Sequence, residues 1–218
     1  MEYIGISIND KKLILSSIDA RKCSNIAYSI YDISQVAVIN GIIFNITYLE
    51  DLIKKFTLDY KIKSNNIIIS INNSTIHKQI FQNFTQSNYK KLELSSLDNY
   101  FIKTQELQFY PSSIFYQAAI INNHIFQYNL LAINLGFNLS CLTTDFISWY
   151  YFYKVNCSNV TIEANANLSI DYLRAFFRNV ALDKVKILKE ELCLKIEHDD
   201  LMTIYGMYYI YLLIKNSV

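Results

Sequence analysis

The chain has 218 residues, with 20 lysines and arginines against 19 aspartates and glutamates, so its net charge is only +1. A protein that binds nucleic acid usually carries a basic excess, because contacts to phosphates dominate that affinity. The sequence therefore argues against a nucleic-acid partner. A hydrophobic fraction of 52% and a single proline also exclude a disordered or linker-rich chain.

Glycine is scarce, since the chain has only four, and no two of them lie within a few residues of each other. A Walker loop or a dinucleotide-binding fingerprint needs clustered glycines, because only a backbone without Cβ approaches phosphate closely. Both motifs are therefore excluded. The start of the sequence lacks the basic and apolar regions of a secretory signal, so we expect a cytosolic protein. The longest apolar stretch, residues 201–214, is shorter than the ~20 residues that a membrane-spanning helix needs.

The first third of the chain predicts the element order β-β-β-α-β. Residues 2–8 and 12–17 are expected to form two strands joined by a polar turn, and residues 34–44 are rich in β-branched side chains. The apolar period then changes to that of an amphipathic helix at residues 48–60. The apolar run at residues 66–71 predicts a strand buried on both faces.

Strands and helices continue to alternate in the rest of the chain. The further predicted helices span residues 87–101, 128–136, 145–153, 169–178 and 198–215. The further predicted strands span residues 114–121, 138–143, 159–164, 184–188 and 192–196. Pro111 follows the first of these helices, and Gly136 is expected just after the second, where a left-handed residue often ends a helix. The alternation predicts an α/β fold.

Few side chains stand out as chemical groups. The densest polar cluster consists of His198 and the acids Glu190, Glu191, Glu197, Asp199 and Asp200. Imidazole and carboxylate groups can bind metals, but acids at the start of a helix are explained by the helix dipole, so no metal site is expected. Asp19 and Asp145 follow predicted strands, where α/β proteins often place a site; a turn or cap role is the simpler interpretation. No nucleophile motif is present, and we predict neither a catalytic residue nor a cofactor.

Short strings along the chain resemble those of a known family. Residues 5–10, Gly-Ile-Ser-Ile-Asn-Asp, are followed by Lys12, and residues 38–43, Val-Ile-Asn-Gly-Ile-Ile, precede a predicted helix. Residues 130–137 resemble a helix that usually ends in Ala-Gly-Leu. On these strings, and on the order of elements over nearly the whole chain, the sequence is similar to the PilM family of type IV pilus assembly proteins, most closely to its short HofM-like members.

The resemblance implies an actin-like, ribonuclease H-like α/β fold. Such a fold would have a βββαβ subdomain, a pilus-family insertion at about residues 81–123, and a reduced second lobe. It divides the chain into a first lobe, residues 1–153, and a second lobe, residues 154–218.

The resemblance also implies a function, that of a scaffold in a type IV pilus or DNA-uptake assembly complex. Such a protein docks the cytoplasmic N-terminal peptide of an inner-membrane PilN-like protein, and it meets the membrane only through that partner. In the family the peptide groove lies between the first subdomain and the insertion, which here corresponds to residues 81–101 and 114–121. The sequence does not identify individual peptide contacts or an oligomeric state.

The family's first phosphate loop departs most clearly from this sequence. Ser7 and Asn9 replace its metal-organising aspartate and its glycine, and the next residue, Asp10, would repel phosphate. We therefore expect a degenerate nucleotide site that neither binds nor hydrolyses ATP. Two alternatives stay open. One is an actin-like enzyme with a non-standard phosphate site, using Asp10, Asp19 and Asp145. The other is the cytoplasmic part of a GspL-like type II secretion protein, which would be expected to continue into a membrane-spanning helix.

Overall fold

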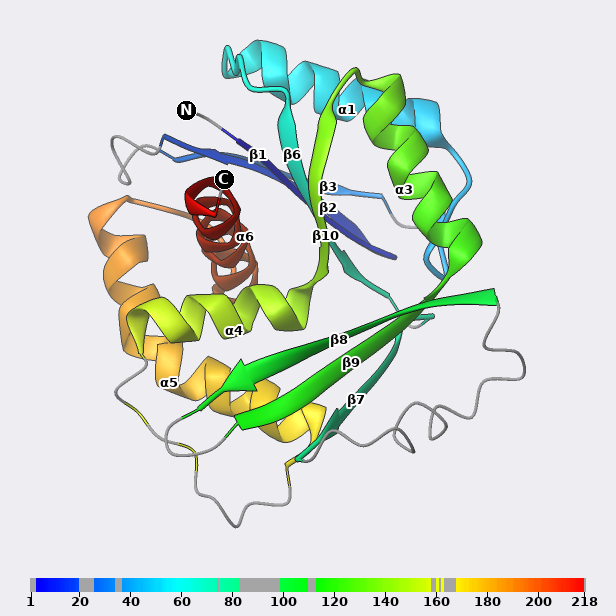
Figure 1. Cartoon of the computed structure of the whole chain (residues 1–218). Coiled ribbons are helices and arrows are strands. Elements are labelled where there is room, and N and C mark those ends of the chain that lie inside the picture. Colours follow the sequence, from blue (N-terminus) through cyan, green and yellow to red (C-terminus); the bar gives the residue numbers. More distant parts are fainter. Residues whose placement is uncertain are drawn as a thin grey trace.

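The computed structural model describes residues 3–19, 26–33, 37–73, 75–82, 99–109, 113–157, 160, 162 and 168–217. Within these residues the chain forms a five-stranded sheet, a three-stranded sheet and a two-stranded hairpin, with helices packed between and around the two larger sheets (Figure 1). Among the described residues, no helix is both long enough and apolar enough to cross a membrane.

The five-stranded sheet has the strand order β10-β6-β1-β2-β3. Its strands are β1 (Ile4–Asn9), β2 (Lys12–Ile18), β3 (Ile26–Asp32), β6 (Asn66–Asn72) and β10 (Asn138–Thr144). Strands β1, β6 and β10 are parallel, whereas β2 and β3 are antiparallel to their neighbours. The carboxyl ends of the three parallel strands therefore lie at the same edge of the sheet.

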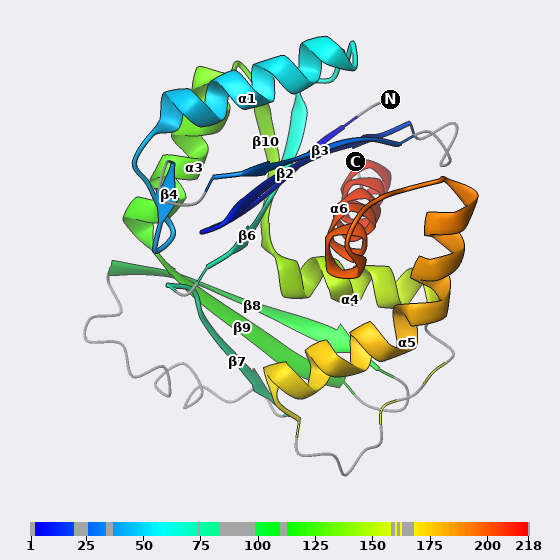
Figure 2. The same cartoon turned by 180° about the vertical axis from the view of Figure 1, so that it is seen from behind.

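Helices cover both faces of this sheet, as Figure 2 shows from behind. On one face, Ile4, Ile6 and Ile8 of β1 pack in a core with α1 (Ile46–Asp59) and α3 (Asn122–Asn134). The other face carries α4 (Asp145–Asn156) and α6 (His198–Asn216). A Cβ at Gly5 would lie 3.0 Å from Cε of Met207, so the lack of a side chain there lets α6 approach the sheet.

The three-stranded sheet is antiparallel and has the order β7-β9-β8. Its strands are β7 (His77–Phe81), β8 (Tyr100–Gln108) and β9 (Ser113–Ile121). It shares a core with α4 and with α5 (Ile170–Glu191), in which the rings of Tyr116 and Phe146 stack with centroids 4.7 Å apart. Aromatic packing therefore joins the second sheet to the helices on the first, and the division at residue 153 stays a prediction.

Most strands and helices of the five-stranded sheet and its covering layers lie where the sequence predicts them. The predicted strands at residues 2–8, 12–17, 66–71, 114–121 and 138–143 and the helices at residues 48–60, 145–153 and 198–215 are confirmed, with small shifts of their ends. The helix predicted at residues 169–178 is also present, but it extends to Glu191. The predicted helix at residues 128–136 begins earlier, at Asn122, and Gly136 follows it with a φ of 69°, as expected.

The strand predicted at residues 34–44 is wrong. The third strand of the sheet is β3, which was not predicted, and part of residues 34–44 forms the small hairpin of β4 (Val38–Ile39) and β5 (Ile42–Ile43). The hairpin turns at Asn40 and Gly41, whose φ angles of 50° and 75° are those that an Asn-Gly turn adopts. The predicted helix at 87–101 lies mostly outside the described residues, and its end, Phe101, belongs to β8.

The strands predicted at residues 184–188 and 192–196 are also wrong. Helix α5 continues through the first segment because Leu173, Phe177, Ala181 and Val185, four residues apart, form one buried stripe. The second segment is a loop that begins after Cys193, whose φ of 51° ends the helix. The strand predicted at 159–164 lies largely outside the described residues, and Val160 and Ile162 are not in a strand.

Candidate functional site

The three expected phosphate-loop residues lie at the end of β1 and in the turn to β2. Ser7 is buried. The side chain of Asn9 accepts hydrogen bonds from the backbone N–H groups of the two residues after Asp10, at 2.8 and 2.7 Å. The carboxylate of Asp10 accepts one from the backbone N–H of Gly41 at 2.7 Å. Both side chains thus hold turns of the chain together, and their place in a degenerate nucleotide site stays a prediction.

These residues border a cleft of about 630 Å³, which we call the charged cleft. It lies at the carboxyl ends of β1, β6 and β10, the sheet edge at which α/β proteins usually bind ligands. The first halves of α4, α5 and α6 and strand β7 form its other walls. Its charged lining residues are Asp10, Lys11, Lys12, Lys78, Asp145, Asp171, Arg174, Arg178, Glu197, Asp199 and Asp200.

A buried ion cluster forms one side of the charged cleft. Asp145, the first residue of α4, accepts hydrogen bonds from Nζ of Lys78 on β7 at 3.3 Å and from Arg174 on α5 at 2.5 Å. The side chains of Asp145 and Lys78 are only 5% and 11% exposed. Burial lowers the pKa of Lys78, and the charge of Asp145 opposes that effect. One buried carboxylate therefore supplies the counter-charge for cations from two other elements.

A second set of ion pairs joins the start of α6 to the other walls. Lys12 lies 2.5 Å from a carboxylate oxygen of Glu197 and 3.4 Å from one of Asp200. Arg178 on α5 makes paired hydrogen bonds to the carboxylate of Asp199. The acids that the helix dipole predicts at the start of α6 therefore also bind cations of β2 and α5.

The charged cleft is poorly prepared for a phosphate group. Its carboxylates outnumber its cations, and Lys12, Lys78, Arg174 and Arg178 are already paired with them. An added phosphate would have to displace the protein's own carboxylates. Asp10 and Asp145 line the cleft, but Asp19 is not among the lining residues. In the part of the chain that the structure describes, no three metal-ligating side chains are grouped to hold a metal ion, around His198 or elsewhere.

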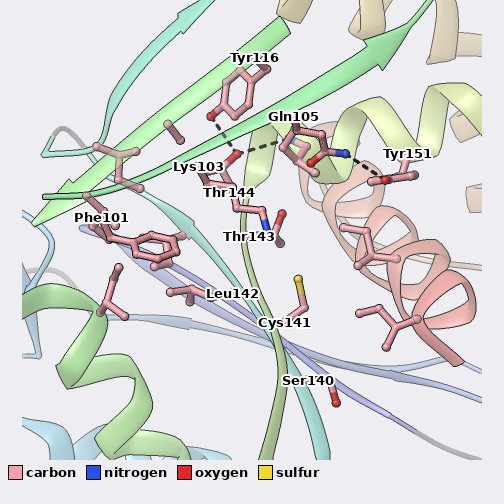
Figure 3. Close-up of a pocket in the computed structure, with 18 of the residues that line it drawn as sticks. Phe101, Lys103, Gln105, Tyr116, Ser140, Cys141, Leu142, Thr143, Thr144 and Tyr151 are labelled. Atoms are coloured by element: carbon pink, nitrogen blue, oxygen red, sulfur yellow. Dashed lines mark hydrogen bonds between the residues drawn. The ribbon is translucent and has the colours of Figure 1, made fainter. Parts of the chain in front are cut away.

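A second hollow, which we call the apolar groove, lies between the two larger sheets and has a volume of about 530 Å³ (Figure 3). Helices α3, α4 and α6 close its ends and sides. Its lining residues are Ile71, Ile76, Phe101, Lys103, Gln105, Tyr116, Ala118, Ile120, Ile125, Asn129, Ser140, Cys141, Leu142, Thr143, Thr144, Ile147, Tyr151, Ile210, Leu213 and Ile214. Phe101 and Leu213 are large apolar side chains that are 52% and 49% exposed at this groove.

The two sheets meet the apolar groove in different ways. Strands β8 and β9 contribute alternate residues, 101, 103 and 105 from β8 and 116, 118 and 120 from β9, so they present one face. Strand β10 instead contributes the five consecutive residues 140–144, so its outer edge borders the groove. Among the described residues, β10 pairs only with β6. An open strand edge therefore lies opposite an apolar sheet face.

Four of the polar side chains that line the groove form hydrogen bonds with one another in two pairs. Nε2 of Gln105 donates to the hydroxyl of Tyr151 at 3.0 Å, and the hydroxyls of Tyr116 and Thr144 lie 3.0 Å apart (Figure 3). Burial raises the pKa of both tyrosines and of the Cys141 thiol, against a smaller opposite effect of Lys103 on Cys141. These groups therefore stay neutral at neutral pH.

The sequence located only part of this groove. It pointed to residues 81–101 and 114–121, and of these Phe101 and the inward residues of β9 line the groove. It gave no sign that β10 and the end of α6 complete the lining. The sequence did single out several residues that line the charged cleft, namely Ser7, Asn9, Asp10, Asp145, Glu197, Asp199 and Asp200. It did not show that they lie together, because the ion pairs of the cleft join residues far apart in the chain; Lys12 and Glu197, for example, are 185 residues apart.

The fold of this chain is similar to the folds of several solved structures. The structure of the PilM-PilN type IV pilus biogenesis complex contains a similar chain, with a TM-score of 0.59, 10% sequence identity, and 88% of this chain and 74% of that chain covered. The cytoplasmic domain of EpsL, an inner membrane component of the type II secretion system of Vibrio cholerae, matches with a TM-score of 0.47, 6% identity, and coverage of 68% and 57%.

A Bacteroides thetaiotaomicron protein with an actin-like ATPase fold matches with a TM-score of 0.43, 12% identity, and coverage of 72% and 57%. No protein-family model and no curated protein sequence matches the chain. The likeness to the chain of the PilM-PilN complex shows that the two chains share a fold, the actin-like α/β fold that was expected from the sequence.

Proposed function

We propose that this chain is a cytoplasmic scaffold of a type IV pilus assembly complex, similar to PilM and its HofM-like members. In this proposal it docks the N-terminal peptide of a PilN-like inner-membrane protein in the apolar groove and reaches the membrane through that partner. The observation that carries the proposal is the open edge of β10 facing the apolar side of β8 and β9. The likeness in fold to a chain of the PilM-PilN complex supports it.

An extended peptide fits this arrangement better than a compact ligand does. A segment that pairs with β10 would satisfy backbone N–H and C=O groups along the strand edge, and its alternate side chains would lie against β8 and β9. The exposed rings and aliphatic groups at the groove, such as Phe101 and Leu213, would lose contact with water on binding. Main-chain hydrogen bonds would supply affinity, and the side-chain contacts would supply specificity.

The charged cleft, in this proposal, is a degenerate nucleotide site. It has the position of a ligand site, at the carboxyl ends of three parallel strands, which favours a nucleotide-binding enzyme as the second candidate. Its paired cations and the carboxylate of Asp10 argue against that candidate. Helix N-termini can bind phosphate, but α4, α5 and α6 each carry an acid in the first turn that they present to this cleft.

Calorimetric titration with two ligands tests the proposal. The full chain is titrated with a synthetic peptide copied from the N-terminus of the PilN-like protein of the same genome, and separately with ATP and Mg²⁺. We expect micromolar peptide binding and no heat from ATP. ATP binding without peptide binding would overturn the scaffold proposal and favour the enzyme.

A pair of matched variants locates the peptide. Ala118 lies half-buried in the floor of the groove, opposite Lys103 on β8, so Ala118→Trp fills the groove and should abolish binding. Ala175 is exposed on α5 and lines neither hollow, so Ala175→Trp introduces the same side chain and should bind normally. Equal affinity of the two variants would exclude the apolar groove as the docking site.

A further inference from the structure

A single charged side chain, Lys103 of β8, lines the apolar groove among the residues that the structure describes. Its ammonium reaches from β8 toward Thr143 of β10, on the opposite wall (Figure 3). No carboxylate in the described part of the chain lies within ion-pair distance of it. In the charged cleft, by contrast, cations from β2, β7 and α5 are matched by the protein's own acids.

The other polar groups near Lys103 do not replace a counter-ion. Gln105 is bonded to Tyr151, and Tyr116 to Thr144, so these pairs are already satisfied. The nearby thiol of Cys141 is protonated at neutral pH, because burial raises its pKa. A segment bound over Lys103 would remove water from the ammonium, and a cation without water or a partner is costly. The bound segment must therefore bring its own negative charge or lose affinity.

We propose that the apolar groove selects an extended peptide that carries an acidic side chain opposite Lys103, between apolar side chains. This inference rests on the proposed peptide docking and adds the chemistry of the peptide. Phe101, Lys103 and Gln105 are successive inward residues of β8, so an extended segment along them meets an aromatic ring, a cation and an amide in turn. The acidic residue should therefore lie two positions from an apolar residue that contacts Phe101.

Selection from a library of random linear peptides, displayed on phage and panned on the full chain, tests this inference. Peptides that bind the unaltered chain and fail to bind Ala118→Trp are sequenced, and we expect enrichment of Asp or Glu beside apolar residues. The best sequence is then synthesised in acidic and amide forms. The amide form should bind the unaltered chain about tenfold more weakly, a loss typical of one charge pair.

The charge of Lys103 is then reversed. Lys103→Glu should prefer a version of the peptide with lysine in place of the acid, whereas Lys55→Glu, at an exposed position on α1, should keep the original preference. Equal binding of the acidic and amide forms to the unaltered chain would overturn the role of Lys103 and leave peptide docking intact. Selected peptides that bind Ala118→Trp as well as the unaltered chain, or no selected peptides at all, would overturn both proposals.

Discussion

At the charged cleft, Nη2 of Arg174 on α5 lies 2.5 Å from a carboxylate oxygen of Asp145 on α4, although the two residues are 29 positions apart in the sequence. Lys78 of β7 reaches the other oxygen of the same carboxylate at 3.3 Å. One buried carboxylate therefore joins β7, α4 and α5, which come from different parts of the chain. Removing such a buried carboxylate alone lowers the free energy of unfolding strongly, because its partners stay charged and lose their counter-ion.

Asp145→Asn tests that dependence. The amide keeps the size of the side chain but removes the charge that compensates Lys78, whose side chain is only 11% exposed. We expect the free energy of unfolding to fall by about 3–5 kcal/mol, measured by urea denaturation. Asp171→Asn, at an exposed residue of the same cleft, should change it by less than about 1 kcal/mol. Equal losses in the two variants would show that the buried carboxylate of Asp145 contributes no more to stability than the exposed one of Asp171.

Gly206 gives a second test, at the contact between α6 and α4. A Cβ at Gly206 would lie 1.9 Å from the backbone oxygen of Ser148, so the two helices would have to separate. We expect Gly206→Ala to lower the melting temperature strongly and to cost at least about 1–3 kcal/mol, as overpacked cores do. Gly5→Ala should cost less, because its Cβ would meet the ends of the Ser16 and Met207 side chains, which can rotate.

Much of the fold was predictable because burial on a sheet leaves a regular pattern. Strand β6 is an almost uninterrupted run of isoleucine, as a strand covered on both faces should be. Helix α5 shows the limit of this approach: Val185 and Ile187 favour a strand locally, yet they continue a helix whose buried stripe began at Leu173. Packing against the aromatic core outweighs the weak local preference.

The candidate sites were less predictable than the fold. Alternation of inward and outward residues in β8 was the available signal for one wall of the groove, and a helix prediction ending at Phe101 obscured it. The edge position of β10 depends on strand order, which a single sequence does not reveal. The same holds for the Asp145 cluster, since no spacing rule connects it with residues 78 and 174.

Two histidines, His124, which is buried, and His198, which is half-buried, predict how stability depends on pH. Burial lowers the pKa of His124 on α3 and of His198 at the start of α6, so both are more readily protonated in the unfolded chain. Their contribution to stability is therefore complete above the unfolded value of about 6.5 and is lost as the pH falls below it. Urea denaturation at pH 7.5 and pH 5.5, values on either side of about 6.5, should show a lower free energy of unfolding at the acidic pH.

Substitution separates this effect from the titration of other groups. His124→Asn keeps a polar group near the Thr75 hydroxyl, which lies 3.3 Å from Nδ1, but cannot take up a proton. The loss of stability on acidification should therefore be smaller in this variant than in the unaltered chain. His77→Asn, at an exposed position on β7, is the matched control and should keep the full loss. Identical losses in the two variants would contradict a role for His124.

Thiol labelling provides a direct measure of access to the apolar groove. Cys193 is exposed, Cys141 is half-buried at the groove and Cys157 is buried, and burial raises the pKa of the last two. Because the thiolate is the reactive form, Cys193 should react first with an aromatic disulfide reagent, followed by Cys141 and then Cys157. The measurement is made in a Cys23→Ser background, with mass spectrometry to assign each modified residue.

A bound peptide should change only one of these rates. Since Cys141 lies on β10 among the lining residues of the groove, an occupant paired with that strand would cover its thiol. Labelling of Cys141 should slow on addition of a peptide that binds the unaltered chain, whereas the rate at Cys193 should stay the same. In Ala118→Trp, which does not bind the peptide in our proposal, the peptide should have no effect on either rate. Protection of Cys193 instead of Cys141 would place the occupant at the end of α5 and outside the groove.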